Sequence, residues 1–431
     1  MIETLLNEEW CKKLLTFERL WLGLSGGLDS CVLLHNLATI PQLKSKLTAI
    51  HVNHGLSAYA QDWQKLVEKI CHELHIPLIA EKVDFNRQSN IEAGARKARY
   101  ALFHTFVEAH DALLLAHHQN DQAETLLLHL CRGTGIDGLS AMVPRQPSGK
   151  GILLRPLLHH TREQLEEYAH RHQLLWVNDE SNEDTRFNRN FLRQQVIPLL
   201  QQKWPALINH LAHTANHCAE AQCNLTELAW IDCAALKTPS KVLFLPVIAN
   251  LSDSRLINVL RVFLKNNGLR LPSRAIVSQI IFELIKAKKE ANPSIQWGQH
   301  CIRRFGDNLY LLAVQSEDKA QEMQWTNFPK PLHLGLGKGV LQAYKNNLGM
   351  IIPENSLIEV RYRQGGETIV LKGQTKSVKK LMQEWQIPPW LRASMPFIYI
   401  NNQLAAIVNY AISDEFYSST QENVYHIRRD C

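Results

Sequence analysis

The sequence has no Cys-x-x-Cys pair, no long hydrophobic run and no low-complexity tract, and each absence excludes a class of protein. Its nine cysteines are scattered, so we expect reduced thiols in a cytoplasmic protein. No window of about 18 uninterrupted apolar residues occurs, which argues against a membrane-spanning helix and a membrane partner. The first residues include acidic side chains and no long apolar stretch, so we predict no secretory signal.

Composition is ordinary for a globular protein. The chain has 431 residues, of which 45% are hydrophobic and 20% are charged. This length predicts two or three domains, each large enough to bury its own core. The net charge of +6 is compatible with binding a nucleic acid and equally with plain solubility.

The first 205 residues alternate short apolar runs with helical patterns. We predict strands over 20–24, 47–52, 77–83, 112–116 and 152–154. We predict helices over 30–37, 61–74, 91–109, 121–130 and 161–172, the last of them opened by a capping box of Thr161 and Gln164. This order is typical of an α/β domain, in which a parallel sheet is covered by helices on both faces. Ser25, Asn53 and His117 each follow a predicted strand, so we expect them to share the carboxyl edge of the sheet.

The chain changes character twice after this domain. Trp204-Pro205 interrupts the pattern, and residues 206–327 are predicted to form a mainly helical domain with strands between residues 295 and 315. Pro329, Pro331 and several glycines then precede a mixture of strand and helix patterns. We predict strands over 358–362, 368–371 and 405–408 and a helix over 378–385, and therefore a small α+β domain over residues 328–431.

A glycine-rich loop stands between the first predicted strand and the first predicted helix of the α/β domain. It reads Ser25-Gly26-Gly27-Leu28-Asp29-Ser30. Glycine allows close approach of the backbone to a phosphate, and the helix start presents free N–H groups. No Gly-Lys-Ser/Thr follows, so this is not a Walker A loop. The glycine spacing alone fits a tight, capped strand-to-helix turn equally well.

The complete hexapeptide resembles the SGGxDS signature of the PP-loop ATP pyrophosphatases, and further motifs narrow the resemblance. They are His51-Val52-Asn53-His54-Gly55-Leu56, Glu92 to Tyr100, Ala116 to Thr125, Arg132-Gly133-Thr134-Gly135, Arg155-Pro156-Leu157-Leu158 and Asn188-Arg189-Asn190. In the tail, Gly365-Gly366-Glu367, Lys379-Lys380-Leu381 and Pro388-Pro389-Trp390-Leu391-Arg392 continue it. Together these motifs resemble the tRNA(Ile)-lysidine synthetase family, strongly over about the first 200 residues.

This resemblance implies a fold and a reaction. The fold is that of the adenine nucleotide alpha hydrolase-like PP-loop domains. ATP adenylates the C2 carbonyl oxygen of the wobble cytidine in a tRNA(Ile) with a CAU anticodon, and pyrophosphate leaves. The amine of free L-lysine then attacks C2 and expels AMP. The implied partners are this tRNA and L-lysine, and a homodimer is left open.

The resemblance also implies roles for individual residues. The ATP-binding set is Ser25, Gly26, Gly27, Leu28, Asp29, Ser30, His51 and Asn53, and the catalytic set is Asp29, Arg99, His118, Asp121 and Glu124. Asp29 is the candidate to hold Mg²⁺, which prefers oxygen ligands. Asp121 and Glu124 lie three apart on a predicted helix, so they share a face that suits a cationic lysine. A solvated acidic helix start is the alternative for this pair.

The resemblance implies that basic and amide side chains along the whole chain bind the tRNA. The substrate-binding set is Arg96, Arg132, Asn190, Arg361, Lys379 and Lys380. For Arg96 and Arg99, and for the basic tail, a solvated charged face is the alternative. Relatives often have Asp where this sequence has Asn120, which puts that position in doubt.

Three other functions remain open at this stage. A PP-loop tRNA thiolase often uses paired cysteines, which are absent here. An amidotransferase-like synthetase does not account for the basic tail. An RNA-binding protein with a degenerate nucleotide fold does not account for an intact SGGLDS loop.

Overall fold

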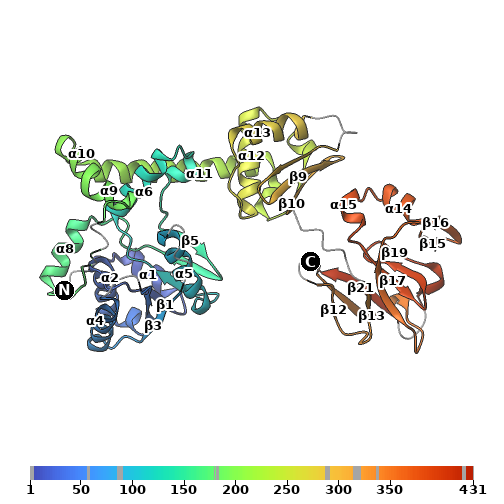
Figure 1. Cartoon of the computed structure of the whole chain (residues 1–431), viewed down its shortest axis with the longest axis horizontal. Helices are drawn as coiled ribbons and strands as arrows, with labels where there is room; N and C mark the ends of the chain where they lie inside the picture. Colours follow the sequence, from blue (N-terminus) through green and yellow to red (C-terminus); the bar gives the residue numbers. More distant parts are fainter. Residues whose placement is uncertain are drawn as a thin grey trace. The chain divides into compact units, whose positions relative to one another are not determined.

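The protein consists of two compact units, Met1–Ile231 and Asp232–Cys431. In a computed structural model, residues 4–55, 59–84, 91–178, 180, 184–286, 292–313, 322–335, 339–419 and 424–430 are described (Figure 1). The domain boundaries at 205/206 and 327/328 stay predictions.

A six-stranded sheet forms the centre of the first unit, in the order β3-β2-β1-β4-β6-β5. Its strands are β1 (Leu20–Gly23), β2 (Leu47–Asn53), β3 (Leu78–Lys82), β4 (Ala112–Leu114), β5 (Arg145–Ser148) and β6 (Gly151–Leu154). Neighbouring strands are parallel except β5, which pairs antiparallel with β6. The predicted parallel sheet is confirmed, and β5 is an edge strand that the sequence pattern did not predict.

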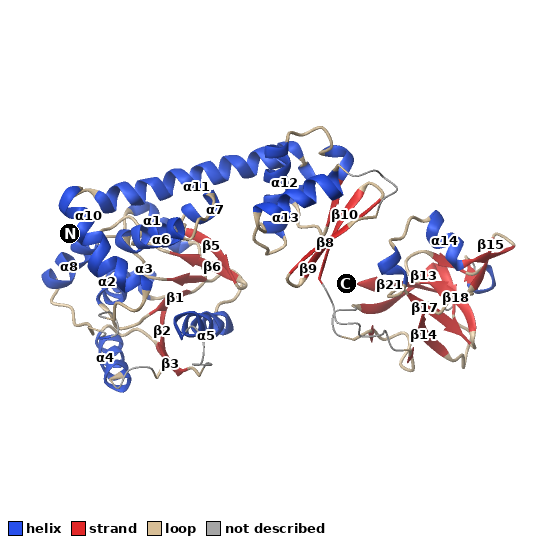
Figure 2. Cartoon of the chain, turned by 45° about the horizontal axis from the view of Figure 1, so that its top comes forward, coloured by secondary structure: helices blue, strands red, loops and turns tan. Residues whose placement is uncertain are grey.

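Both faces of this sheet are buried, because alternate side chains of each strand point to opposite faces. Leu20 and Leu22 of β1 pack in one apolar cluster, and Trp21 between them packs in another. The first cluster includes residues of α2 (Leu28–Ala38), α4 (Ala60–Glu73) and α8 (Arg162–Arg171), and the second includes residues of α5 (Ile91–Phe106). Figure 2 shows α5 and α2 on different sides of the strands. The expectation of helices on both faces is therefore confirmed.

The remaining helices of this unit lie before the first strand of the sheet, between its strands or after its last strand. They are α1 (Glu8–Leu15), α3 (Pro41–Lys44), α6 (Gln119–Cys131), α7 (Ile136–Leu139), α9 (Asn188–Phe191), α10 (Ile197–Lys203) and the long α11 (Leu207–Asp232). A π-helical turn, Leu192–Val196, joins α9 to α10. Ala123 of α6 packs with Ile197 and Ile208, so this helical layer is held against α6.

The second unit begins with helices and a four-stranded sheet in the order β7-β10-β9-β8. The helices are α12 (Asp253–Asn266) and α13 (Arg274–Gln279), and the strands are β7 (Val242–Phe244), β8 (Ser294–Trp297), β9 (His300–Phe305) and β10 (Asn308–Ala313). All neighbouring strands are antiparallel. The strands predicted between residues 295 and 315 are found here.

The tail is an α+β assembly built from antiparallel sheets. One sheet has the order β11-β14-β17-β18-β19, and in another β13 pairs with β12, β20 and β21. The strands are β11 (Met323–Gln324), β12 (Leu332–His333), β13 (Val340–Ile351), β14 (Ile358–Tyr362), β15 (Thr368–Leu371), β16 (Gln374–Ser377), β17 (Pro396–Ile400), β18 (Gln403–Ile407), β19 (Ala411–Ile412), β20 (Tyr417–Ser418) and β21 (Val424–Asp430). Its helices are α14 (Val378–Glu384) and α15 (Pro389–Arg392), so the predicted fold class of the tail is confirmed.

Two chemical features apply to the described residues as a whole. The eight cysteines that the structure describes are free thiols. Among the described helices, none combines the length and the apolar character that crossing a membrane requires.

Candidate active site

The polar residues that follow β1 and β4 meet where the strand order of the first sheet reverses. From β1 the chain proceeds outward through β2 and β3, and from β4 it proceeds the other way through β6. The carboxyl ends of two adjacent strands diverge at such a point and leave a crevice, which is where open α/β sheets bind ligands. The SGGLDS loop follows β1, and His117 and His118 follow β4.

Hydrogen bonds between its own residues hold the SGGLDS loop in shape. Ser25 Oγ lies 3.1 Å from Ser30 Oγ, and Ser30 Oγ donates to the carbonyl of Gly27 at 2.9 Å. Gly26 has a φ of +89°, a value that favours glycine, and its N–H donates to Ser30 Oγ at 3.2 Å. Because α2 starts at Leu28 without a side-chain cap, its first N–H groups remain available to an anion.

Two predicted ATP-binding residues lie at the end of the neighbouring strand β2. His51 is buried, and its Nδ1 donates to the carbonyl of Leu24 at 2.9 Å. Burial lowers the pKa of His51, so it remains neutral at physiological pH. Asn53 accepts from the N–H of Gly55 at 2.9 Å and donates to Gln64 at 3.2 Å. Both side chains therefore have partners within the protein.

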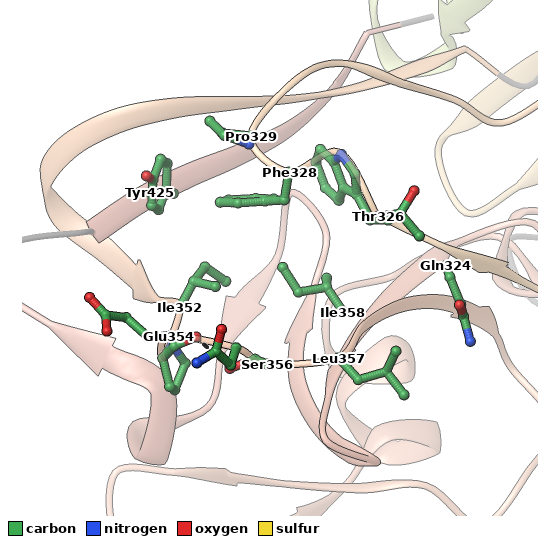
Figure 3. A pocket seen from close by; sticks show the side chains of 13 residues that line it. Gln324, Thr326, Phe328, Pro329, Ile352, Glu354, Ser356, Leu357, Ile358 and Tyr425 are labelled. Atoms are coloured by element: carbon green, nitrogen blue, oxygen red, sulfur yellow. Dashed lines mark hydrogen bonds between the residues drawn. The ribbon is translucent and has the colours of Figure 1, made fainter.

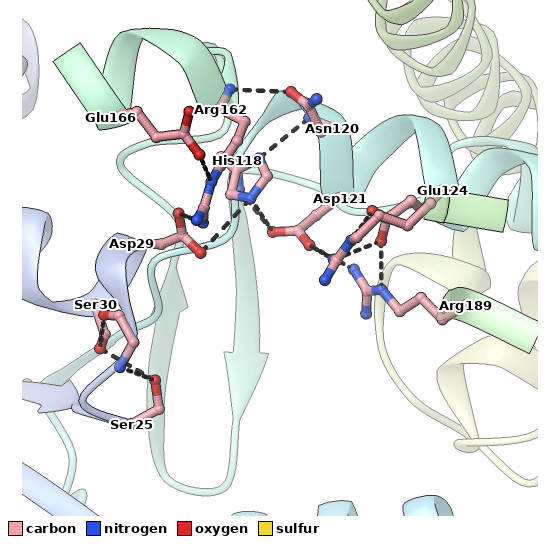
Figure 4. A network of polar contacts seen from close by, with 12 residues as sticks. Ser25, Asp29, Ser30, His118, Asn120, Asp121, Glu124, Arg162, Glu166 and Arg189 are labelled. Atoms are coloured by element: carbon pink, nitrogen blue, oxygen red, sulfur yellow. Dashed lines mark hydrogen bonds and ion pairs between the residues drawn. The ribbon is translucent and has the colours of Figure 1, made fainter. Parts of the chain in front are cut away.

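Asp29 lies on the first turn of α2 and faces a residue that the sequence did not indicate. Arg162 Nη1 is 2.5 Å from Asp29 Oδ1, and Arg162 Nε donates to Glu166 at 2.8 Å (Figure 4). Arg162 occupies the first position of α8, after the predicted capping box of Thr161 and Gln164, which the structure confirms. Asn120 Oδ1 accepts from the Arg162 N–H at 3.0 Å. A carboxylate at position 120 would accept the same bond, so Asn120 is compatible with this arrangement.

His118 starts α6 and joins the two groups of carboxylates. Its Nδ1 accepts from the N–H of Asn120 at 3.2 Å, while its own N–H donates to Asp121 Oδ2 at 3.0 Å, which makes a reciprocal capping box. Because Nδ1 accepts, the proton of the neutral imidazole is on Nε2. Nε2 lies 3.7 Å from Asp29 and 3.4 Å from Asp121.

Asp121 and Glu124 share a helix face as predicted, and two arginines neutralise them. Arg189 donates to Glu124 at 2.6 Å and to Asp121 at 2.7 Å. Arg193 donates to Glu124 at 2.6 Å and 3.0 Å and lies 3.4 Å from Asp121. Burial alone would raise the pKa of Asp121, but the positive charge of Arg189 and the hydrogen bond from the backbone N–H of His118 hold it well below its usual range. Figure 4 shows Asp121, Glu124 and Arg189 on one side of His118 and Asp29 on the other.

A second group of cations lies around Tyr100 on α5. Arg96 donates to the Tyr100 hydroxyl at 3.3 Å and stacks on its ring, and Arg99 lies over the same ring. Arg155, which follows β6, is 2% exposed and donates to the carbonyl of Val143 at 2.6 Å. Burial lowers the pKa of Arg99 and of Arg155, and the positive charge of Arg96 lowers both further.

The other predicted substrate residues are distributed over both units. Arg132 is exposed at the carboxyl end of α6, roughly 20 Å along the helix from His118. Asn190 is buried and donates to the carbonyl of Asp184 at 3.0 Å. In the second unit, Arg361 is ion-paired with Glu359 at 2.6 Å, whereas Lys379 and Lys380 are exposed on α14.

The sequence did not predict that Arg162, Arg189 and Arg193 pair with the site's carboxylates. Sequence separations of 133 residues for Arg162–Asp29 and 65 for Arg189–Glu124 give no local signal. The capping box at Thr161 was the one sequence feature that placed Arg162 at a helix start.

The loop, the sheet order and the polar crevice define a PP-loop nucleotide-binding protein, and comparison with known proteins agrees. A model of the PP-loop domain matches residues 2–200. A model described as the TilS substrate binding domain matches residues 243–310, and one described as the TilS substrate C-terminal domain matches residues 358–428.

Relatives cover nearly the whole chain. A tRNA(Ile)-lysidine synthase of Legionella pneumophila strain Paris is 44% identical, over 99% of each protein. The one from Coxiella burnetii is 41% identical over 92% of this chain and 90% of its own. The chain belongs to the tRNA(Ile)-lysidine synthase family. A solved U34-tRNA thiolase from Methanococcus maripaludis matches 50% of this chain and 76% of its own, at 17% identity and a TM-score of 0.41, too weak a likeness to support an argument.

Proposed function

We propose that this protein ligates L-lysine to C2 of the wobble cytidine of a CAU-anticodon tRNA(Ile), consuming ATP and releasing AMP and pyrophosphate. The observation that carries the proposal is the SGGLDS loop at the reversal of the strand order, in a chain related over nearly its full length to tRNA(Ile)-lysidine synthases. Free cysteines and a tRNA substrate favour a cytoplasmic location.

The loop suits adenylate formation. A pyrimidine C2 carbonyl is a weak electrophile, so its oxygen has to become part of a good leaving group before an amine attacks. When the C2 oxygen attacks the α-phosphorus of ATP, negative charge builds up on the phosphates. The N–H groups at the start of α2 are suited to stabilise that charge. The hydroxyls of Ser25 and Ser30, which bond to each other and to the loop backbone, hold the loop that presents them.

A magnesium ion fits this site through one carboxylate. Mg²⁺ in phosphoryl-transfer sites is commonly held by one or two carboxylates together with substrate phosphates. No group of three or more potential ligands occurs among the described residues, so the protein would supply Asp29 and the nucleotide the remaining oxygens. Bound Mg²⁺ would neutralise phosphate charge, while Arg162 holds the Asp29 carboxylate in place at 2.5 Å.

Asp121 and Glu124 are the proposed site for the cationic lysine. Two carboxylates and two guanidiniums carry no net charge together, so one arginine must withdraw before an ammonium group is attracted. Arg193 is the better candidate to withdraw, because its side chain is 40% exposed and that of Arg189 is 25% exposed. A carboxylate freed in this way can also accept the proton that the amine loses as it attacks C2.

The cations around Tyr100 are the proposed site for the target nucleotide. Arg155 directly follows β6, Arg96 and Arg99 lie on α5 beside Tyr100, and guanidiniums bind phosphate and stack on bases. Lys379, Lys380 and Arg361 of the tail are proposed to bind tRNA phosphates away from the anticodon. A homodimer stays a prediction, which measuring the mass of the protein in solution would test.

One incubation tests the overall reaction. Labelled lysine, ATP and an unmodified CAU-anticodon tRNA should yield labelled tRNA together with AMP and pyrophosphate. A thiolase or an amidotransferase-like synthetase would incorporate no lysine, and an RNA-binding protein would release no AMP. Formation of AMP without lysine transfer under these conditions would contradict the proposal.

The role of Asp29 predicts a specific loss. Asp29→Ala should lower pyrophosphate release by at least about 100-fold, because the variant loses the carboxylate for Mg²⁺. Binding of tRNA should stay within about 2-fold of wild type, since phosphate contacts made elsewhere dominate RNA affinity. Pyrophosphate release and a filter-binding titration measure the two effects. Near-normal turnover in Asp29→Ala would exclude this role.

A further inference from the structure

A pocket in the tail of the second unit has no part in the proposed chemistry. Its volume is about 470 Å³, within the range of pockets that hold small ligands. Figure 3 shows Phe328 and Tyr425 on one side and Ile352 and Ile358 on the other, with the turn over residues 353–357 closing the lower end. The pocket is therefore a slot between an aromatic wall and an aliphatic wall.

The aromatic wall is held rigidly before any ligand binds. The Phe328 ring lies edge-to-face with Tyr425, at 4.7 Å between centroids, and with Trp325, at 5.0 Å. Trp325 is 3% exposed, and its Nε1 donates to the carbonyl of Lys330 at 2.7 Å. Phe328 and Tyr425 remain only partly buried, so apolar ring surface is left facing the slot. A flat aromatic ligand fits such a surface by stacking.

The polar groups of the pocket select the ligand further. Among the residues that line it, Glu354 is the only charged one, and it is exposed on the turn. The uncharged polar residues of the lining, Gln324, Thr326, Asn355 and Ser356, can donate and accept hydrogen bonds. The Glu354 carboxylate only accepts them and repels a phosphate, so it favours a ligand with N–H donors at its edge of the slot. Of the four RNA bases, guanine presents two adjacent donors, N1–H and N2–H, which match the two oxygens of a carboxylate. Uracil presents one donor between two carbonyls.

Cations stand outside the slot, where a nucleotide backbone would run. Lys345 is one of the two β13 residues that pair with Tyr425, at a break in the β13–β21 register. Lys330 follows Pro329 of the pocket lining. Both lysines are exposed. Phosphates would thus meet positive charge outside, while the base enters an apolar slot with an acidic edge.

We propose that this pocket binds one unstacked guanine of the tRNA, at a position other than the target cytidine. The inference rests on the proposed function, because it takes tRNA as the substrate. Single-stranded RNA positions are recognised in this way, by stacking on aromatic side chains and hydrogen bonds to the base edge.

The test uses the full chain and two kinds of RNA. In ligand-observed NMR, the trinucleotide UGU should show saturable binding and UUU should not. Glu354→Gln should weaken UGU binding by roughly 5-fold, because a charge-assisted hydrogen bond is lost. Tyr425→Leu should weaken binding of full-length tRNA by about 5- to 100-fold, the range for one lost stacking interaction, and Tyr425→Phe should not. Glu415→Gln removes an exposed acid of the same domain outside the pocket lining and serves as the charge control.

The outcomes separate this inference from the proposed function. If wild type transfers lysine to tRNA but binds UGU and UUU equally, or if Tyr425→Leu keeps wild-type tRNA affinity, the guanine pocket is wrong and the enzyme assignment stands. If wild type binds UGU through Glu354 but never transfers lysine, the proposed reaction is wrong. Loss of folded protein in Tyr425→Leu, seen as a lower melting temperature, leaves the Glu354→Gln and trinucleotide results to decide.

Discussion

Glu124 is 1% exposed and binds two guanidiniums, so a substitution there has a stability effect and a substrate effect that must be separated. Glu124→Gln leaves Arg189 and Arg193 facing one carboxylate. We expect it to lower the free energy of unfolding by about 2–3 kcal/mol, less than the ~3–5 kcal/mol for a fully buried pair, because Arg193 is partly hydrated. Urea denaturation measures this loss, and steady-state kinetics should show a raised KM for lysine.

A second substitution separates the two effects. Arg193→Gln in the Glu124→Gln background removes the unpaired cation, so about half of the lost unfolding free energy should return. The KM for lysine should stay raised, because the carboxylate is still missing. If the double variant regained both stability and the wild-type KM, the cluster of Asp121, Glu124, Arg189 and Arg193 would be purely structural and lysine would bind elsewhere.

His117 makes stability depend on pH. Desolvation lowers its pKa to about 3, although Asp121 acts in the opposite direction. In the unfolded chain a histidine titrates near 6.5, so between about pH 6.5 and 3 the unfolded state binds more protons. Its contribution is complete above pH 6.5 and is lost as the pH falls, with a slope of up to about 1.4 kcal/mol per pH unit.

His117→Asn should therefore flatten the fall in unfolding free energy between pH 6.5 and 4. Chemical denaturation at several pH values measures it. His75→Asn is the matched control, because His75 is exposed and has a φ of +51°, which Asn tolerates. Equal slopes in wild type and His117→Asn would show that this histidine is not desolvated in solution.

At the scale of elements, local sequence signals predicted the start of helix α8 and the bounds of several strands well. The predicted strands over 358–362 and 368–371 coincide with β14 and β15. The capping box at Thr161 is present because both of its hydrogen bonds are local. β5 was not predicted because Arg145–Ser148 contains Pro147 and polar residues, and only its pairing with β6 makes it a strand.

The first turn of α8 links the stability of this helix to the geometry of the candidate active site. Thr161 Oγ1 accepts from the N–H of Gln164 at 3.3 Å, and the next residue, Arg162, contacts Asp29. Thr161→Ala should lower the free energy of unfolding by about 1 kcal/mol and raise the KM for ATP by a few fold, because the first turn that carries Arg162 frays. Thr161→Ser keeps the cap and should behave as wild type. An unchanged KM for ATP in Thr161→Ala would mean that Arg162 does not depend on the cap.

At the scale of the molecule, the sequence located the crevice but not its internal charge balance. Residues after β1, β2 and β4 must share one edge of a parallel sheet, so Ser25, Asn53 and His117 were placed by topology alone. The pairing of Arg189 with Asp121 and Glu124 depends on how α9 packs against α6, which no periodicity encodes. A predicted acidic surface is therefore a neutral cluster in the folded protein.

Two exposed lysines of the tail allow a test of where the chain contacts tRNA phosphates. Lys379 and Lys380 are exposed, whereas Arg361 is paired with Glu359 and stacks on Tyr399 at 4.6 Å. The two lysines are thus the freer charges for phosphate contacts. Each phosphate neutralised contributes up to ~0.9 to the slope of log K against log salt. Replacing both by Ala should weaken tRNA binding and flatten that slope by roughly 1 to 2 units.

The control has to remove the same charge from elsewhere. Lys12 and Lys150 are also exposed, but they are ion-paired with Glu8 and Glu108, both at 2.7 Å. Lys12→Ala/Lys150→Ala changes the net charge by the same two units, so a general electrostatic effect would appear in both double variants. A local phosphate contact would appear only in Lys379→Ala/Lys380→Ala, as a changed slope in filter binding from about 50 to 200 mM salt. If both double variants keep the wild-type slope, this part of the tail is a solvated basic face and the tRNA contacts lie elsewhere in the chain.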